Sequence, residues 1–430
     1  LYPNQIQCQT LLEARRLHAY LYNACLAHRR FEWRKNRKSI DYFSQQNALP
    51  AFRECWEEYK QLNLSSLQAT VKRVDLAYNS FLKGIRKRPK FKSIRDYSGW
   101  TYPDGRQGFK VEIKTSEKYA VNHGWVILND LNLKIKMRGR FQYWGKPTTC
   151  TLVYRPHRDE WYVSFTVKVE ETPCKFGSQS PLSYESMVAF DLGTATALTC
   201  FDGENFEEID NPRFDREFAP KIRAASKALR RKRRPIRGQQ KASNRWKKSQ
   251  QKISRLKAKQ SRVRQDWQHK VTTDLSSRYD IAVTEKLNVK GMTRKAKKGK
   301  RKRQKAGLNR SLLDVGFGTL NQLIVYKIVA KGGVHLTINT RKVKPSQRCP
   351  NCGKVHKDWA NLSNRYHVCD NCGFEMGRDK SSVVVMWNVA AGQQPGVGTN
   401  LVSRRCSSST DSPRTHTGGM MQLGQKKRLG

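Results

Sequence analysis

The sequence predicts a multi-domain α/β protein. Three observations support this fold class: a length of 430 residues, a change along the chain from helical to alternating hydrophobic patterns, and two closely spaced cysteine pairs towards the C-terminal end. A typical domain has ~100–200 residues, so we expect two to four domains.

Residues 1–108 are expected to form an N-terminal helical bundle. Apolar residues return at three- and four-residue steps from Leu11 to Ala24 and again from Leu67 to Leu82. This spacing places them on one face of a helix, where they can pack against a neighbouring helix.

Residues 109–171 change to the alternating pattern of β-strands. The runs 110–114, 125–128, 133–136 and 161–167 alternate apolar and polar residues and are separated by Asn, Gly and Asp, so we predict a β-barrel-like module. Its aromatic residues, among them Trp100, Trp125, Trp144, Trp161 and Tyr162, could stack on bases, but packing inside the module is the favoured interpretation.

A polar linker at 172–186 precedes an α/β core at 187–345. Residues 187–191 and 192–201 read as two antiparallel strands around a tight turn, and strands are also expected at 281–284 and 334–339 with a helix at 320–330. A short helix is predicted from Asp379 to Ala391, within the segment 377–394. The Ser-, Thr-, Gly- and Arg-rich residues 395–430 are expected to be disordered.

The composition is strongly basic, with 84 Lys and Arg, 35 Asp and Glu and a net charge of +49. Such a chain repels itself unless a polyanion neutralises it, so nucleic acid is the expected partner. An anionic membrane is the rival, but the sequence shows no uninterrupted apolar stretch of spanning length and no clean basic amphipathic helix.

Two segments concentrate this charge. Residues 221–264 carry 19 Lys or Arg and no acid, in helix-compatible sequence that continues to Leu275, and residues 290–310 carry 11 and no acid. Part of 295–305 is expected to be merely solvated. Candidate nucleic-acid contacts in the first segment are Lys221, Arg223, Arg230, Arg231, Arg233, Arg234, Lys247 and Lys248.

Cys349, Cys352, Cys369 and Cys372 form two Cys-x-x-Cys pairs that sixteen residues separate. This is the spacing of a four-cysteine zinc ribbon, predicted at 346–376, and four protein ligands leave no open position for catalysis. Unligated thiols or two disulfides are the alternative. His356 and His367, between the pairs, are expected on the ribbon surface. An odd number of cysteines without a signal peptide favours a reducing compartment.

Three acids adjoin apolar strands or open a helix: Asp191, Glu285 and Asp379. Alone, each is more often a turn or capping residue. Their order, with Asp-x-Gly entering a hairpin, a later strand ending in Glu and a helix opening with Asp, is that of an RNase H-like sheet that gathers three carboxylates around two Mg²⁺ ions. Carboxylate oxygens suit Mg²⁺, and two metals ~3.5–4 Å apart can assist both the attacking and the leaving oxygen of a phosphodiester.

At these residues the chain resembles the TnpB family, transposon-encoded RNA-guided RuvC-like endonucleases related to compact type V CRISPR effectors. The resemblance rests on residues 1–3, 20–23, 90–92, 188–193, 283–285, 345–353 and 369–379. It implies a recognition region at 1–108, a wedge module at 109–171, a split RuvC domain, a guide RNA, a double-stranded DNA target beside a short motif, and Asp191, Glu285 and Asp379 as the catalytic acids. Together with the expected nucleic-acid partner and the reducing compartment, this resemblance leads us to expect a prokaryotic cytoplasmic location associated with the nucleoid.

The chain departs from the family pattern at two places near the third acid. Gly377 stands where many members have Asp, and residues 380–387 are bulkier than the Asn-Ala-Ala that commonly follows. Three other functions stay open: a catalytically silent RNA-guided repressor, a transposase that uses the same three carboxylates, and a zinc-ribbon nucleic-acid-binding protein without enzymatic activity.

Overall fold

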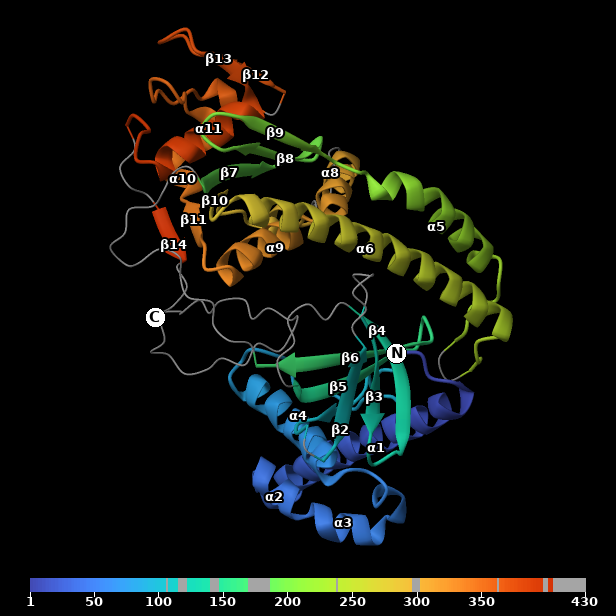
Figure 1. The fold of residues 1–430 in the computed structure, drawn as a ribbon. Helices are drawn as coiled ribbons and strands as arrows, with labels where there is room; N and C mark the ends of the chain where they lie inside the picture. The colour runs from blue at the N-terminus through green and yellow to red at the C-terminus, as the bar shows by residue number, and fades with distance from the viewer. Residues whose placement is uncertain are drawn as a thin grey trace. The chain divides into compact units, whose positions relative to one another are not determined.

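The structure is a computed structural model that describes residues 1–105, 107–114, 122–139, 147–168, 186–236, 239–295, 302–361, 363–396 and 401–404. It divides into two compact units, one within Leu1–Glu170 and the other within Glu171–Ser412 (Figure 1). Trp144 and nearly all of the predicted linker lie outside the described residues.

The first unit combines helices with two three-stranded sheets. Its helices are α1 (Gln5–Asn36), α2 (Tyr42–Asn47), α3 (Leu49–Cys55), η1 (Glu57–Tyr59) and α4 (Leu64–Leu82). One sheet has the order β1 (Thr101–Tyr102), β5 (Pro147–Arg155), β6 (Glu160–Val167), and the other β2 (Phe109–Lys114), β3 (Asn122–Leu128), β4 (Leu133–Gly139). The strands predicted from the alternating runs are confirmed.

One hydrophobic core holds this unit together. Leu17 and Val71 of the helices and Trp100, Val126 and Leu152 of the sheets belong to the same cluster of buried residues. The helical and β-rich segments predicted separately therefore share a core, because each apolar helix face is covered by a sheet face. Burial of Trp100 and Trp161 confirms that they are packing residues, whereas Tyr162, also expected to pack, is exposed because it lies on the outward face of β6.

The second unit is built on a six-stranded mixed sheet. Its order is β14 (Leu401–Arg404), β11 (Val334–Ile338), β10 (Ile281–Glu285), β7 (Met187–Leu192), β8 (Thr196–Phe201), β9 (Phe206–Asp210). Strands β7, β8 and β9 form an antiparallel meander, whereas β10 pairs in parallel with both β7 and β11. The predicted strands at 187–191, 192–201, 281–284 and 334–339 are confirmed within a residue or two, except that β8 begins only at Thr196.

Helices cover both faces of this sheet (Figure 1). α11 (Arg378–Ala390) packs on the face formed by Met187, Ala189, Ile281 and Val283. α6 (Asn244–Arg278) and α9 (Phe317–Ala330) cover the opposite face. Continuous apolar runs in β7 and β10 suit strands that are buried on both sides.

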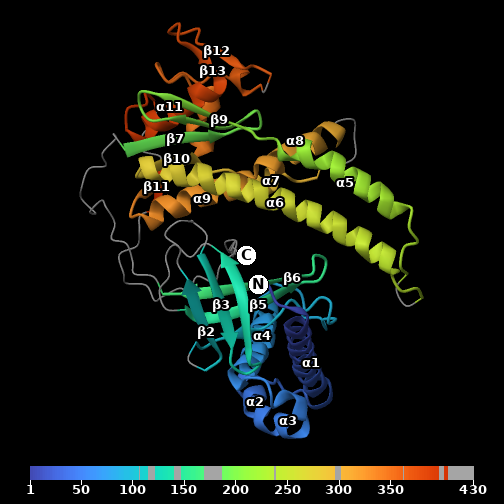
Figure 2. The ribbon, with the colours of Figure 1, turned by 45° about the vertical axis from the view of Figure 1, so that its right-hand side comes forward.

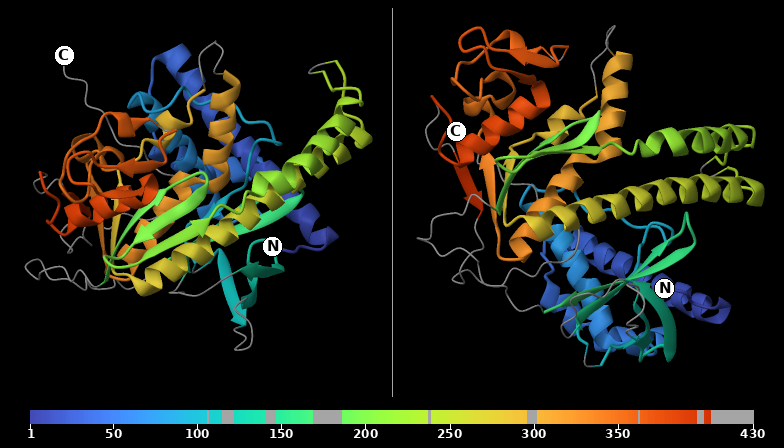
Figure 3. Two further views of the ribbon diagram at one scale, coloured as in Figure 1. Left: turned by 90° about the horizontal axis from the view of Figure 1, so that it is seen from above. Right: turned by 45° about the horizontal axis from the view of Figure 1, so that its top comes forward.

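The basic segment 221–264 folds as two antiparallel helices rather than one continuous helix. α5 (Phe214–Arg230) ends before Pro235, and α6 begins at Asn244, capped by Ser243. Proline restricts the preceding residue to extended conformations and so opposes continuation of the helix. The paired helices extend away from the sheet (Figures 2 and 3).

Two expectations need correction. Residues 401–404, expected in a disordered tail, form β14 on the edge of β11, whose backbone groups would otherwise lack strand partners. The stretch Lys302–Ala330 does reach the length and hydropathy of a membrane span. Gly316, at φ 76°, divides it into α8 (Lys302–Val315) and α9, and the apolar residues Phe317, Leu320, Ile324 and Ile328 pack in the core.

Candidate metal centres and nucleic-acid surfaces

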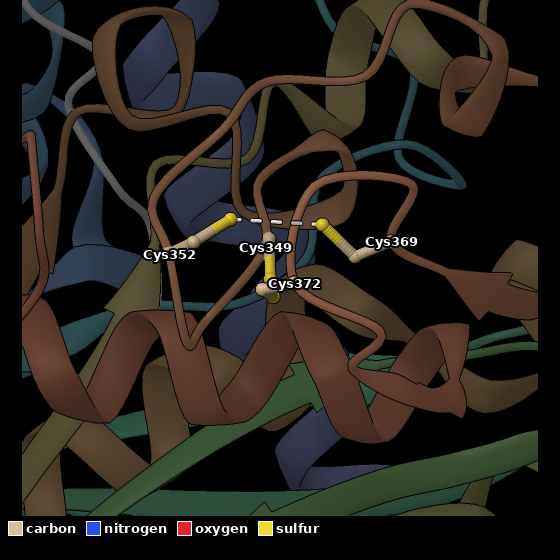
Figure 4. Close-up of side chains that lie close together, drawn as sticks. All are labelled: Cys349, Cys352, Cys369 and Cys372. Carbon is tan, nitrogen blue, oxygen red and sulfur yellow. Dashed lines mark hydrogen bonds between the residues drawn. The ribbon is translucent and has the colours of Figure 1, made fainter.

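The four predicted zinc ligands converge from two turns (Figure 4). Their sulfurs all lie within 4.8 Å of one another, and the Sγ atoms are 3.6 Å apart both between Cys349 and Cys372 and between Cys352 and Cys369. Four sulfurs ~2.3 Å from a tetrahedral zinc would be separated by about 3.8 Å. The cluster therefore fits a zinc ion.

Glycines close both turns. Gly353 and Gly373 adopt the left-handed conformation, with φ 78° and 70°, and their N–H groups donate to the carbonyls of Cys349 and Cys369. A Cβ at Gly353 would also lie 2.4 Å from the Pro395 carbonyl oxygen. The backbone thus holds each pair of thiols in place before a metal binds.

The expectation that His356 and His367 are surface residues is wrong. Their exposed fractions are 7% and 0%, and their rings stack on either side of the buried Trp359 ring. The loop between the cysteine pairs folds back over itself, and large flat rings fill the small ribbon where aliphatic side chains are scarce. The nearest signal in the sequence was Trp359 itself, a large aromatic residue between the cysteine pairs that can pack against other rings.

Asp191 and Glu285 lie at the same end of two neighbouring strands. β7 and β10 run parallel with Thr284 beside Phe190, so the next residues, Glu285 and Asp191, are adjacent. Side chains alternate along a strand, which places Asp191 with Met187 and Ala189, and Glu285 with Ile281 and Val283. Both carboxylates therefore share the face that α11 covers.

Asp379 approaches this end of the sheet from α11. It lies in the first turn of that helix, which packs on β7, β8 and β10. The bulky residues Val383, Val385 and Met386 that follow are fully buried in the core beneath α11. Their bulk is thus accommodated by the core, and the helix that carries the third acid is intact.

Electrostatic interactions connect the three acids. Burial raises the pKa of Asp191 to about 6, and the charge of Asp379 adds to this rise. Burial also raises the pKa of Glu285 to about 8, with a further contribution from Asp191. The guanidinium of Arg378 opposes both pKa shifts. Asp191 is therefore the carboxylate that interacts with both of the others.

The carboxylate oxygens of Asp191, Glu285 and Asp379 do not all lie within 4.8 Å of one another. One ion bound by all three carboxylates would bring their oxygens that close together, whereas two ions would not. Metals ~3.5–4 Å apart with ligands ~2.1 Å away span about 8 Å between outer ligands. Carboxylates that do not all lie this close together are compatible with a site for two ions.

The eight candidate nucleic-acid contacts lie on the α5–α6 helical hairpin and the turn between its helices, and all are exposed. Their charges are not equally available: the Lys221 Nζ lies 3.3 Å from the Glu217 carboxylate. Arg223 lines a pocket with Lys257 and Arg310, so three cations from α5, α6 and α8 face a common space. Asp215 lines the same pocket, and its carboxylate lies 3.9 Å from the Arg310 Nε, so part of this positive charge is already paired.

A second basic surface, missed from the sequence, lies on the first unit. It joins the end of α1 to the segment after α4 and contains Arg34, Lys35, Arg37, Lys38, Lys83, Arg86, Lys87, Arg88 and Lys90, all exposed. Arg30 links the two segments, since its Nη2 donates to the Pro89 carbonyl and its guanidinium lies 4.5 Å from the Phe91 ring centroid. Exposed Phe31, Trp33 and Phe91 rings accompany these charges. The run of basic residues at 83–90 is the sequence feature that could have predicted this basic surface.

Two family models match the second unit and the last residues of the first unit. The probable transposase family OrfB_IS605 matches residues 164–296, and the Cas12f1-like TNB domain matches residues 317–385. The second match contains the cysteine cluster and Asp379, and the first contains Asp191 and Glu285.

Proteins of similar length match most of the chain. InsQ of Escherichia coli (strain K12), whose name proposes an RNA-guided DNA endonuclease, is 28% identical over 79% of this chain and 78% of its own. A Streptomyces pristinaespiralis protein, whose name likewise proposes an RNA-guided DNA endonuclease, is 25% identical over 98% and 97%.

The fold is similar to that of Cas12f1 in its complex with sgRNA and target DNA. The TM-score is 0.53 at 13% sequence identity, over 90% of this chain and 83% of the Cas12f1 chain. The family models, the curated relatives and the fold agree with one another, and they confirm the predicted resemblance of this chain to the TnpB family.

Proposed function

We propose that the protein is an RNA-guided DNA endonuclease that hydrolyses phosphodiesters at a site formed by Asp191, Glu285 and Asp379. The observation that carries this proposal is the convergence of the three acids from β7, β10 and α11 at one end of a buried sheet. Placing carboxylates in such a setting costs stability unless cations neutralise them, so structural acids are not expected there.

The three carboxylates would hold two Mg²⁺ ions, which when bound supply an activated water and stabilise the leaving oxygen. Asp191, which interacts electrostatically with both other acids, would hold these ions together with Glu285 and Asp379. Arg378 partly offsets the raised pKa values of Asp191 and Glu285, which favours the ionised form that binds metal.

The four cysteines would hold a structural zinc ion, because no ligand position is left for substrate. Guide RNA and target DNA are the proposed partners, in the reducing cytoplasm of a prokaryote. The α5–α6 hairpin and the basic surface of the first unit supply exposed cations for phosphates, and Phe31, Trp33 and Phe91 add rings on which bases can stack. Target choice would come from base pairing to the RNA beside a short DNA motif.

The test uses protein expressed with its flanking genomic DNA. RNA that co-purifies is sequenced, and the complex is assayed for Mg²⁺-dependent cutting of DNA that matches the end of this RNA, across a library of flanking motifs. Asp191→Asn should lower cutting by about 10³-fold or more, since metal assistance is worth several kcal/mol. Bound RNA should be unchanged.

Asp202→Asn is the matched control, because Asp202 lies in the next turn and its Oδ1 accepts backbone hydrogen bonds that an amide oxygen can retain. A discrete RNA without cutting would favour the silent repressor instead. Strand joining without any RNA would favour the transposase. Cutting that survives Asp191→Asn would place the active site elsewhere.

A further inference from the structure

Three aromatic rings form a continuous stack through the interior of the ribbon. The ring centroids of His356 and Trp359 are 4.1 Å apart with planes inclined by 17°, and those of Trp359 and His367 are 4.1 Å apart and inclined by 14°. All three side chains are buried. Flat rings in nearly parallel contact resist relative movement, so the stack behaves as one rigid body.

One end of the stack lies at the cysteine cluster. The His356 Nε2 is 3.3 Å from the Cys369 sulfur, and its Nδ1 is 3.4 Å from an Asp370 carboxylate oxygen. The backbone N–H of His356 also donates to the Gln347 carbonyl, two residues before Cys349. The His356 ring thus contacts the sulfur of Cys369, a predicted zinc ligand, and the His356 backbone is hydrogen-bonded close to the other cysteine pair.

The other end lies beside the third acid. His367 is the middle residue of β12 (Tyr366–Val368) and pairs with Met376 of β13 (Glu375–Gly377). β13 continues without a break into Arg378 and Asp379, and the Arg378 N–H donates to the Arg365 carbonyl at 2.9 Å. Any displacement of His367 would therefore be carried into the first turn of α11.

Within the described residues, neither ring nitrogen of His367 has a hydrogen-bond partner, although the side chain has no exposed surface. Stacking on Trp359 and strand pairing are therefore what fix the ring. A buried imidazole left without partners costs stability that an apolar ring would avoid. Its position is determined by the neighbouring ring rather than by polar contacts.

We propose that the His356–Trp359–His367 stack is a positioning device that couples the cysteine cluster to Asp379. Cys369, held by zinc when the cluster is loaded, would fix the stack, the stack would order β12 and β13, and Asp379 would be held in position for the candidate site that it forms with Asp191. This inference rests on the proposed function, because it requires both metal centres. Trp359 and His367 are positioning residues and touch neither substrate nor the bridging acid.

The test measures the coupling between the two metal centres. Mn²⁺ stands in for Mg²⁺, and its affinity is determined by electron paramagnetic resonance for zinc-loaded and zinc-free protein, with Asp191→Asn subtracted as the blank. In the unmodified protein, zinc should tighten Mn²⁺ binding about tenfold, a size typical of outer-shell effects on metal sites.

Trp359→Leu should retain one zinc per chain, because all four thiols remain, yet zinc should no longer alter Mn²⁺ affinity. Trp359→Phe keeps a flat ring and should recover most of the coupling. Tyr366→Ala, at an exposed β12 position beside His367, should behave as the unmodified protein. If Trp359→Leu fails to hold zinc, His367→Leu, one ring further from the thiols, serves in its place.

Coupling that persists undiminished in Trp359→Leu would overturn the proposal, and so would zinc loss in both Leu variants, since the stack would then serve only the zinc fold. If zinc does not change the Mn²⁺ affinity of the unmodified protein, the proposal is also overturned, but the proposed nuclease site stands. If the protein binds zinc but its Mn²⁺ binding does not depend on Asp191, the proposed active site itself is excluded.

Discussion

Asp191 interacts with both other acids of the candidate site, and its environment makes the site sensitive to pH. Burial raises the pKa values of Asp191 and Glu285 above those of an unfolded chain. Protonation of these groups therefore favours the folded state. The resulting stabilisation is fully present below about pH 4 and is lost as pH rises through about 6 and 8.

At the residue scale we expect a metal-dependent pH profile. Without divalent ions, Asp191→Asn should raise the melting temperature at pH 8 but leave it nearly unchanged at pH 4, because the amide removes a charge that only the ionised protein carries. Mg²⁺ should stabilise the unmodified protein at pH 8 more than at pH 5. Differential scanning fluorimetry measures both, and equal Mg²⁺ effects at the two pH values would contradict the prediction.

At the element scale, the turn between β7 and β8 sets the position of Asp191. Gly193 donates its N–H to the Ala197 carbonyl, and a Cβ at this position would lie 2.3 Å from the Thr196 carbonyl oxygen. The turn therefore closes only with glycine. This explains in packing terms why Asp-x-Gly was an informative pattern.

We expect Gly193→Ala to destabilise the fold by about 1–3 kcal/mol, since the clash is with backbone that cannot rotate away. Cutting should fall further than the loss of folded protein explains, because Asp191 moves with the turn. Gly377→Ala is the control: it adjoins the triad too, but a Cβ there meets nothing within 4 Å. Chemical denaturation measures the stability of both variants, and cutting assays measure their activity. Similar stability and activity of the two variants would contradict the proposed role of the β7–β8 turn in positioning Asp191.

The α5–α6 hairpin is the element that we expect to bind the phosphates of the RNA. Replacing Lys247 and Lys248 together with Gln should weaken RNA binding and reduce the slope of log affinity against log salt by about 1–2, since two phosphate contacts are lost. Lys270→Gln on the same helix should change little, because that lysine already pairs with Asp266 at 2.7 Å. An unchanged slope in the double variant would exclude these lysines from the interface.

At the scale of the whole molecule, a net charge of +49 destabilises the compact state through self-repulsion, so a bound polyanion should stabilise the fold. The bound RNA should raise the melting temperature, and adding salt from 50 to 200 mM should reduce RNA affinity by about 10³-fold or more if six or more phosphates are contacted. Filter binding and thermal melts at several salt concentrations test this. A protein that melts identically with and without its RNA would argue against a guide complex.

The whole molecule also shows where local patterns cease to be informative. The helical residues 1–108 and the β-rich residues 109–171 each carry a clear periodicity, but periodicity does not say which apolar face covers which. The structure places both segments around one core. Likewise, the helix-compatible basic segment 221–264 does not reveal that the chain turns after Arg230 and that α5 and α6 pack against each other.

The sequence by itself determined the α/β class, four of the six strands of the central sheet, the four cysteines as a cluster that could hold a metal and the acids as candidates, because each depends on spacing and residue chemistry within a short segment. Only the tertiary structure decided that Glu285 stands beside Asp191, that α11 delivers Asp379 to the same sheet end, and that His356 and His367 enclose Trp359. Those relations join residues that are far apart in the chain, and they arise from strand register and side-chain packing, which no local pattern encodes.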